Sequence, residues 1–465
     1  MRMNKRRSFT GTLLVAFGMS LLAATTFAQS DLDGDWDVVV IGGGLMGSST
    51  AWQLARGGQN VLLLEMQGEN YTQGSSLGDA RISRSMGPPG DIWGYMHNRT
   101  VAEMKELVDF LNKNGDPTAM DDVYVTSPVN YVRHMSRLEG QSWLSEQPDD
   151  VRVAKTPEEA RSQFDIRLPD NTYIVREYRD YSGTINPGAV IKALHHGTTY
   201  AGGRVEYGQR VTELSRSGSG FSLVVTSVES GESQKIDVPK VVSAAGPYTG
   251  SLLQEVAPEF DGLITPQRVF LAFFEVAPEF WNGLSPTKQQ GLKDLFPAIN
   301  SILQTRASGQ FSMIERYTDR GTPIIKIGGH FQRTEIEDLD TVWQQSLTDE
   351  EISWSYDALL RHLEMLDVGF TRAELLFDAG YSCVYSLTES EVPYVTQASL
   401  PDGNRDSNLV VLGGMSGVGA KGSLAYGVIA ADRLLGRTES DPVYLAAREA
   451  FGFDRMQRDA SAKGD

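Results

Sequence analysis

The stretch Asp37-Val38-Val39-Val40-Ile41-Gly42-Gly43-Gly44-Leu45-Met46-Gly47 decides the fold of this 465-residue chain. Its first five residues are mostly apolar and β-branched, which is typical of a buried parallel strand. The glycines then form the pattern G-x-G-x-x-G, a helical stretch follows, and residues 60–65 have the character of a second strand that ends on Glu65. This order of strand, turn, helix and strand, with an acidic residue 23 positions after Gly42, is the context that a dinucleotide-binding unit requires.

Each residue type in this unit has a physical reason to be there. Gly42 allows a tight turn, Gly44 lets the backbone approach a pyrophosphate, and Gly47 lets the helix pack closely on the strand. The helix N-terminus offers unpaired N–H groups to phosphates, and Glu65 can accept hydrogen bonds from ribose hydroxyls. Because a carboxylate disfavours a 2′-phosphate, the expected ligand is FAD or NAD rather than NADP; a Rossmann-like turn that binds no nucleotide is the alternative. The residues expected to contact the cofactor here are Gly42, Gly44, Leu45, Met46, Gly47 and Glu65.

The composition argues against several other classes of function. Lys and Arg number 42 against 60 Asp and Glu, which gives a formal net charge of −18 and disfavours binding to nucleic acid. Cys383 is the only cysteine, so the chain can form neither an internal disulfide framework nor a thiolate metal site. The six histidines show no metal-binding spacing, and we expect no metal.

The first 28 residues have the pattern of an export signal. A basic segment precedes an apolar stretch, and small residues precede Gln29. Arg6-Arg7-Ser8-Phe9 matches the twin-arginine pattern of proteins that are translocated already folded; an ordinary secretory signal and an uncleaved anchor are the alternatives. No later stretch qualifies as a membrane helix, so we expect a periplasmic or secreted protein without stable membrane insertion.

A polar loop with two arginines follows the second strand, Gly74-Ser75-Ser76-Leu77-Gly78-Asp79-Ala80-Arg81-Ile82-Ser83-Arg84. A nicotinamide enzyme would usually place further βα units at this point. The pattern G-S-x-x-G-D-x-R-x-x-R resembles instead the monomeric sarcosine oxidase group, N-methyl amino acid oxidases within the D-amino acid oxidase superfamily of FAD-dependent amine oxidoreductases. Further stretches resemble this family in its own order: Asp180–Gly183, Arg210–Leu214, Val241–Thr249, Ile324–His330, Tyr381–Tyr385 and Leu409–Lys421.

The resemblance implies an α/β fold in which a Rossmann-type FAD-binding domain interleaves with a substrate domain built on a mixed β-sheet. The expected divisions are a signal peptide at 1–28, an FAD-binding domain at 31–90, 180–250 and 380–440, a substrate domain at 91–179 and 251–379, and a polar C-terminal tail at 438–465. The resemblance also implies further cofactor contacts from Ser75, Arg81, Val211, Ala245, Gly246, Cys383, Gly414, Gly417, Gly419 and Lys421.

Within this family the lone cysteine would hold the flavin covalently. A thiolate can add to the 8α-methyl carbon of the isoalloxazine and leave a thioether, so Cys383 alone would suffice. The thiol must first ionise, and nearby cationic groups would help by lowering its pKa. The alternative is a buried, inert cysteine of the core.

The resemblance assigns catalytic roles to Lys326, Arg84, Lys421, His330 and Tyr385. A positive charge on Lys326 beside the flavin would stabilise superoxide as dioxygen takes its first electron; a solvent-facing lysine on an edge strand is the alternative. Arg84 and Lys421 would hold a substrate carboxylate, and surface ion pairs are the alternative for each. The implied reaction, in a monomer, oxidises the C–N bond of a small amine or amino acid to an imine, with dioxygen reduced to hydrogen peroxide.

The sequence departs from the family pattern at two places. Many members have a histidine pair where this chain has Ser76 and Leu77. The segment Glu315-Arg316-Tyr317 falls where sarcosine oxidases have an active-site tyrosine, and a carboxylate in the site would favour a substrate with an extra positive charge. Two other functions stay open: a dehydrogenase that passes electrons to a quinone or a protein, and a flavin-binding or maturation protein without turnover.

Overall fold

A six-stranded sheet forms around the dinucleotide-binding motif. The structure, a computed structural model, describes residues 31–464 except 72, 89, 147, 303–308, 330, 332, 337 and 344. Strand β1 (Val38–Ile41) pairs in parallel with β2 (Val61–Leu64) on one side and with β13 (Lys240–Ser243) on the other. The strand order is β20-β21-β13-β1-β2-β9, completed by β9 (Arg204–Glu206), β20 (Tyr394–Ser399) and β21 (Arg405–Gly413).

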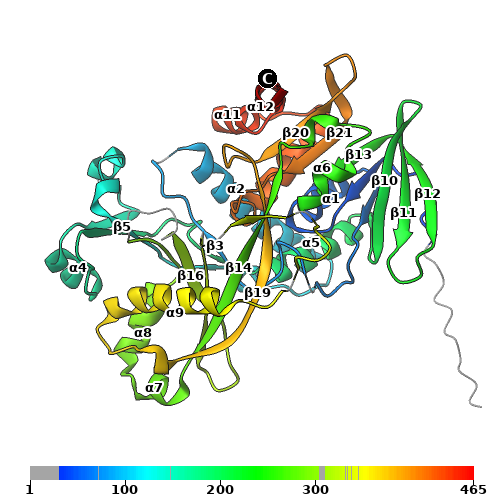
Figure 1. Ribbon diagram of the computed structural model, residues 1–465. Coiled ribbons are helices and arrows are strands. Elements are labelled where there is room, and N and C mark those ends of the chain that lie inside the picture. The colour runs from blue at the N-terminus through cyan, green and yellow to red at the C-terminus, as the bar shows by residue number, and fades with distance from the viewer. Residues whose placement is uncertain are drawn as a thin grey trace, which may run out of the picture. The chain divides into compact units, whose positions relative to one another are not determined.

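Both faces of this sheet are covered, which explains why β1 is apolar at every position (Figure 1). Val38 and Val40 pack in one core cluster with the helices of the first face. Val39 and Ile41 pack on the other face, in a cluster shared with a three-stranded antiparallel meander. The helices are α1 (Leu45–Arg56), α2 (Ile92–Lys113) and α10 (Ser423–Leu434), while α5 (Pro187–Tyr200) packs in a neighbouring cluster with α1 and α2. The meander strands are β10 (Gln209–Ser217), β11 (Gly220–Ser227) and β12 (Ser233–Val238).

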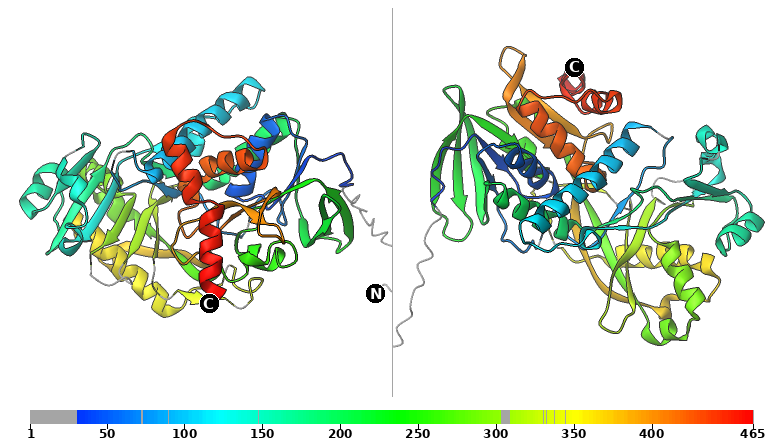
Figure 2. Two further views of the ribbon diagram at one scale, coloured as in Figure 1. Left: turned by 90° about the horizontal axis from the view of Figure 1, so that it is seen from above. Right: turned by 180° about the vertical axis from the view of Figure 1, so that it is seen from behind.

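A second, nine-stranded mixed sheet has the order β18-β14-β17-β16-β15-β5-β7-β6, with β19 paired to β14. Only β15 and β5 pair in parallel within it. Its strands are β5 (Val129–His134), β6 (Val151–Ala154), β7 (Thr172–Glu177), β14 (Thr265–Val276), β15 (Ala298–Ser301), β16 (Gln310–Tyr317), β17 (Pro323–Gly329), β18 (Thr334–Glu335) and β19 (Leu375–Leu387). Figure 2 shows helices against its outer side, and the expected α/β class with Rossmann-type and mixed sheets is confirmed.

Alternation along β17 decides which face of the second sheet is free for a ligand. Ile325 and Ile327 point into a core cluster with residues of α8 (Pro286–Leu295) and α9 (Asp349–Leu363). Lys326 therefore points to the opposite face, because successive side chains of a strand alternate. Further elements outside the two large sheets are β3 (Arg81–Ser83), β4 (Tyr124–Thr126), β8 (Gly183–Ile185), α3 (Met120–Val123), α4 (Pro157–Phe164), α6 (Thr249–Leu252) and α7 (Pro278–Gly283).

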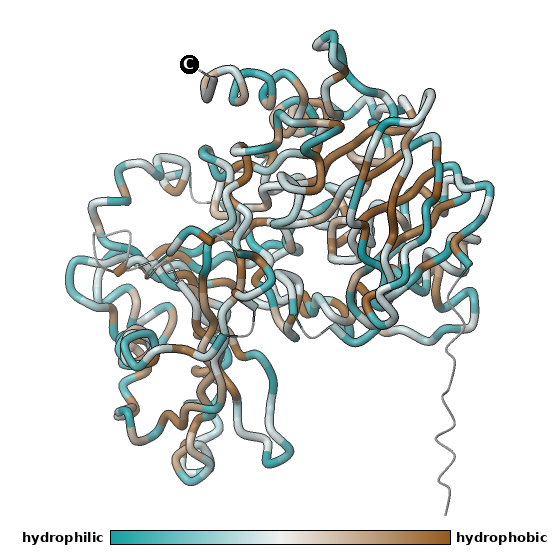
Figure 3. Tube along the Cα trace, turned by 45° about the vertical axis from the view of Figure 1, so that its right-hand side comes forward, coloured by the Kyte–Doolittle hydropathy of each residue, from teal (hydrophilic) through white to brown (hydrophobic). Residues whose placement is uncertain are grey.

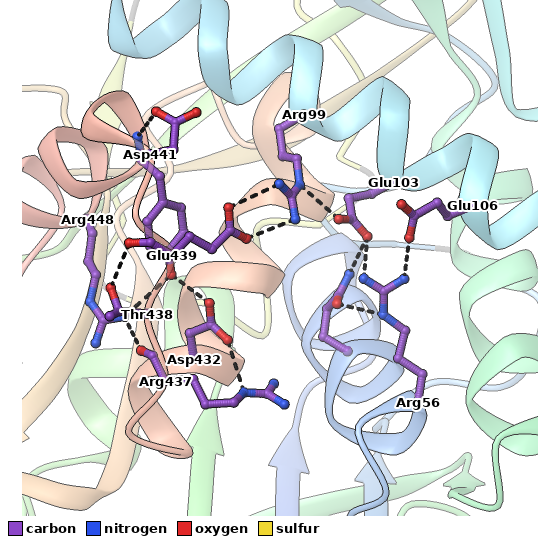
Figure 4. Close-up of polar contacts among 12 residues, drawn as sticks. Arg56, Arg99, Glu103, Glu106, Asp432, Arg437, Thr438, Glu439, Asp441 and Arg448 are labelled. Carbon is purple, nitrogen blue, oxygen red and sulfur yellow. Dashed lines mark hydrogen bonds and ion pairs between the residues drawn. The ribbon is translucent and has the colours of Figure 1, made fainter.

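Residues 438–464 do not form the expected polar tail. They contain α11 (Pro442–Ala450) and α12 (Phe453–Gly464), whose apolar side chains are buried in the cores on both sides of the six-stranded sheet. Glu439 pairs with Arg99 of α2 at 3.0 Å, as Figure 4 shows. The segment has few apolar residues, and they are spaced among charges, so the sequence pattern does not predict this packing. Figure 3 shows the same mixture of apolar and polar positions.

The predicted domain limits remain a prediction, because residues from Leu32 onward form a single unit. The predicted signal peptide lies outside the described residues. Among the residues described, no helix is both long and apolar enough to cross a membrane.

Replacing Gly47 with alanine is expected to destabilise the motif, because the new Cβ would overlap the carbonyl oxygen of Gly42. Neither group can move freely, since one belongs to a helix and the other to a tight turn with φ of +96°. We expect a loss of roughly 1–3 kcal/mol, the usual cost of overpacking, measured by urea unfolding. Gly68→Ala is the control, since its Cβ would have no neighbour within 4 Å. Equal unfolding midpoints for the two variants would contradict this packing.

Candidate functional site

A cavity of about 790 Å³ collects most of the predicted site residues. It is lined by the loops that follow β1, β2 and β13 and by the free face of the nine-stranded sheet. Its volume falls in the range of ligand and cofactor pockets, which favour the carboxyl ends of parallel strands. The predicted residues in its lining are Gly42, Gly44, Leu45, Met46, Glu65, Ser75, Arg81, Arg84, Val211, Ala245, Gly246, Lys326, Cys383, Tyr385, Gly417, Gly419 and Lys421.

Two of the described predicted residues, Gly47 and Gly414, are not in that lining. Gly47 serves the packing of α1 against the turn, as described above. Gly414 has φ of +66° and closes the turn after β21, where a Cβ would overlap the side chain of Thr388. His330 lies outside the described residues, so its predicted role stays a prediction.

At the motif end of the cavity, the groups fit the ribose and pyrophosphate of a nucleotide. The Glu65 carboxylate accepts hydrogen bonds from the Gly43 N–H at 2.6 Å and from the Tyr71 hydroxyl at 2.9 Å, which fixes its position at the end of β2. The N–H of Leu45 donates to Ser76 Oγ at 3.3 Å, so the Ser76 hydroxyl accepts a hydrogen bond from the first residue of α1. The backbone of Gly44 borders the cavity, and the dipole of α1 favours an anion there.

The arginine-containing loop is tied to the strand that carries the cysteine. Ser75 Oγ donates to the carbonyl of Val384 at 2.7 Å, and Arg81 donates to carbonyl groups of its own loop, including that of Ala80 at 2.8 Å. Cys383 is a free, buried thiol in β19. Burial raises the pKa of Cys383, and the positive charge of Arg81 opposes that rise. The thiol is thus held beside a cation that stabilises its thiolate.

Lys326 is a buried lysine in a central strand rather than an edge lysine that faces solvent. Its ammonium group donates to the carbonyl of Ala80 and forms an ion pair with Glu315 of β16. Burial, reinforced by the charge of Arg81, lowers the pKa of Lys326 to about 8, although Glu315 opposes the shift. Glu315 also accepts from the Asp79 N–H at 2.8 Å.

These contacts show that the carboxylate of the segment at 315–317 is held inside the protein rather than offered to a substrate. The Glu315 side chain is 2% exposed and is held by Lys326 and by the loop, and it is absent from the lining of the 790 Å³ cavity. The structure therefore removes the reason to expect a substrate with an extra positive charge.

Arg84 and Lys421 bring two positive charges to the cavity without a carboxylate partner among the residues described. The Arg84 guanidinium lies 5.6 Å from the ring centroid of Tyr131, and its buried Nε has no hydrogen-bond partner. Lys421 precedes α10 and has one weak contact, to the carbonyl of Gly417 at 3.4 Å. Burial, followed by the charge of Arg84, holds the pKa of Lys421 well below its usual value. A buried cation without a partner is costly, so the binding of an anion such as a carboxylate would favour the protonated form of Lys421 and would pair both groups.

The sequence did not reveal His97 of α2, which lies behind this cationic pair. His97 is 2% exposed and lies against the backbone of Arg84. Burial, and then the charges of Lys421 and Arg84, hold the pKa of His97 well below its usual value. The imidazole is therefore neutral, and a single histidine in a helix offers no motif that could have predicted this position.

Tyr385 lines the cavity beside the Gly-rich turn that precedes α10. Burial raises the pKa of Tyr385 to about 12, so its hydroxyl stays protonated at neutral pH and can donate a hydrogen bond. The guanidinium of Arg333 lies 5.8 Å from the centroid of its ring. Among the residues described, no group of three or more His, Cys, Asp or Glu side chains could hold a metal ion.

Comparison with known proteins agrees with this geometry. The family model described as DAO, FAD dependent oxidoreductase, matches residues 37–433. The peroxisomal sarcosine oxidase of Homo sapiens is 26% identical over 243 residues, 50% of this chain and 55% of the human protein. The probable sarcosine oxidase of Arabidopsis thaliana is 25% identical over 226 residues, 48% of this chain and 52% of the plant protein. The matches thus span about half the length of these curated relatives.

Two solved structures share the fold over most of their length. NikD, described as an unusual amino acid oxidase essential for nikkomycin biosynthesis, has a TM-score of 0.64 at 18% identity, covering 90% of this chain and 97% of NikD. Glycine oxidase from Geobacillus kaustophilus has a TM-score of 0.61 at 16% identity, covering 87% and 96%. The chain belongs to the DAO family of FAD-dependent oxidoreductases. The resemblance to sarcosine oxidases expected from the sequence is confirmed.

Proposed function

We propose that this protein is an exported, monomeric oxidase that uses FAD to oxidise the C–N bond of a secondary amine or amino acid to an imine, with dioxygen reduced to hydrogen peroxide. One observation carries the proposal: Arg84 and Lys421, without carboxylate partners among the residues described, line the same cavity as Lys326 and Cys383. The curated relatives named sarcosine oxidases support the substrate class. Cell fractionation would test export, which rests on the signal pattern at 1–28.

The residues of this chain have separable tasks in that reaction. FAD, when bound, supplies the acceptor for the two electrons that leave the amine. Arg84 and Lys421 bind and orient the substrate carboxylate through charge-assisted hydrogen bonds. Their charges also disfavour a protonated amine nearby, so they promote the neutral amine that oxidation requires. Tyr385, with its pKa raised to about 12, can donate a hydrogen bond without losing its proton.

The surroundings of Lys326 bear on whether the protein passes its electrons to dioxygen or to another acceptor. Its ammonium group would stabilise negative charge that develops on dioxygen. Glu315 compensates part of that charge, and this ion pair is the observation that favours the second candidate function, a dehydrogenase with a quinone or protein acceptor. Oxygen consumption with stoichiometric peroxide during turnover of an N-methyl amino acid supports the oxidase. Turnover only with an added quinone supports the dehydrogenase, and no flavin reduction by any amine tested would reject both.

We further propose that Cys383 holds the flavin covalently. The supporting observations are its position in the cavity lining and the nearby charge of Arg81, which partly offsets the rise in the thiol pKa that burial causes. Precipitation of the purified protein with acid should leave the yellow colour in the pellet, and the Cys383→Ala variant should release it to the supernatant. Release from the unmodified protein would contradict the thioether while leaving FAD binding itself intact.

A further inference from the structure

The cavity carries more positive charge than a single substrate carboxylate requires. Among the described residues of its lining, seven are Arg or Lys and two are Glu, in a protein whose net charge is −18. Four of the seven cations have partners inside the protein. Lys326 pairs with Glu315, Arg333 with Glu391 at 3.3 Å and Arg210 with Asp340 at 3.4 Å, and Arg81 donates to loop carbonyls.

The three remaining cations are Arg84, Lys421 and Arg137. Arg137 ends the short turn Met135–Arg137 that directly follows β5. It is an exposed residue that borders the cavity, and no described side chain forms an ion pair with it. One substrate carboxylate accounts for Arg84 and Lys421. Arg137 therefore has no role in the reaction as proposed above.

A fourth cation, Arg133, lies next to this group on the face of the sheet that lines the cavity. Arg133 pairs in register with Ser301 of β15, and Ser301 lines the cavity. The Nε of Arg133 is buried and has no hydrogen-bond partner. The guanidinium groups of Arg84 and Arg133 lie 5.6 and 5.7 Å from the centroid of the same ring, that of Tyr131. These arginines thus form one cationic cluster that continues from the expected carboxylate site toward Arg137.

The cofactor phosphates are an unsuitable partner for this cluster. The dinucleotide motif follows β1 of the six-stranded sheet, whereas Arg133 and Arg137 belong to β5 and the turn after it, in the nine-stranded sheet. Figures 1 and 2 place β5 and the β1 region on opposite sides of the molecule in each view. An anion at Arg137 must therefore come from the substrate side of the cavity.

We propose that the substrate is a dicarboxylic amine, an N-substituted acidic amino acid whose second carboxylate binds Arg137 with Arg133 behind it. Arg84 and Lys421 hold the α-carboxylate, and the α-carbon that carries the reacting amine lies between the two anionic ends. This inference rests on the proposed function for the reaction and adds the specificity of the site. The second carboxylate takes no part in bond breaking, so the balance of atoms and electrons in the oxidation is unchanged.

Matched pairs of substrates test the inference. N-methyl-L-glutamate and N-methyl-L-aspartate are compared with their side-chain amides, which have the same shape without the second charge, by the rate of anaerobic flavin reduction. The holoenzyme should prefer the acids by roughly tenfold or more, the effect of a hydrogen bond to a charged group. In Arg137→Gln this preference should fall to about one. Arg152→Gln is the control, because Arg152 is an exposed arginine of β6 in the same sheet, outside the cavity lining, and it should keep the preference.

A binding measurement separates failure of this inference from failure of the proposed function. If no amine reduces the flavin, the proposed oxidation is wrong, and the second anion site is then decided by calorimetry with 2-(methylthio)glutarate, in which sulfur replaces the amine nitrogen, and with its side-chain monoamide. Tighter binding of the diacid that is lost in Arg137→Gln supports the site. Equal binding of diacid and monoamide overturns it, as does an acid preference that Arg137→Gln leaves unchanged.

Discussion

Replacing Lys326 with methionine is expected to slow the reaction of the reduced flavin with dioxygen by roughly 10²–10³-fold, the usual cost of removing one preorganised charge-stabilising group. The ammonium group is buried, and a charge acts more strongly where water is excluded. Stopped-flow mixing of the substrate-reduced protein with oxygenated buffer measures this step separately from reduction by the amine.

The rate constant for the reaction with dioxygen should depend on pH through the protonation of Lys326. The pKa of Lys326 is lowered to about 8, and only the protonated form carries the charge that dioxygen requires. The rate constant should therefore be constant below pH 8 and should fall above it, and the methionine variant should lack this fall. Glu315→Gln is the companion variant, since it keeps the lysine but removes its counter-charge. At pH 6 we expect it to react at least as fast as the unmodified protein. Equal rate constants for all three proteins would show that Lys326 does not act on dioxygen.

Replacing Arg84 with alanine is expected to lower kcat/KM for an N-methyl amino acid by roughly 10²–10⁴-fold. The guanidinium can form two charge-assisted hydrogen bonds to the substrate carboxylate, each worth about 1.5–3 kcal/mol. Arg84→Lys should recover only part of the loss, because an ammonium group keeps the charge but lacks the planar fork.

An uncharged substrate supplies the control for Arg84. An N-methylated amine of the same length without a carboxylate should be a poor substrate for the unmodified protein, and Arg84→Ala should change its kcat/KM far less. A similar loss with and without the carboxylate would mean that Arg84 supports the architecture of the site, through Tyr131 beneath it, rather than the substrate.

The parts of the site that the sequence predicts are those carried by short contiguous motifs. The glycine-rich turn and Glu65 lie within one βαβ unit, and Cys383 and Lys326 each lie in a strand whose neighbours resemble the family. Their assembly around one cavity follows from these local patterns. The sequence pattern does not predict the packing of the C-terminal segment, because the helices at 442–464 are buried through a few apolar residues among many charges.

The remaining parts depend on contacts between distant segments. The ion pair of Glu315 with Lys326 lies where the pairing of β16 and β17 shifts register between Ile314 and Arg316, and no pattern in the sequence predicts that irregularity. Arg133 and Arg137 are about 50 residues from Arg84 along the chain. The fold brings them together, because Arg84 and Arg133 lie over the same Tyr131 ring and Arg84 and Arg137 line the same cavity. The role in specificity proposed for them therefore rests on the tertiary structure alone.

A crystal structure of the holoprotein with a thioether carboxylate, in which sulfur replaces the reactive amine nitrogen, tests the central claim most directly. The account predicts the flavin ring beside Lys326 and Cys383, with the ligand carboxylate within hydrogen-bond distance of both Arg84 and Lys421. A ligand carboxylate bound elsewhere, with Arg84 and Lys421 turned away from the flavin, would contradict it.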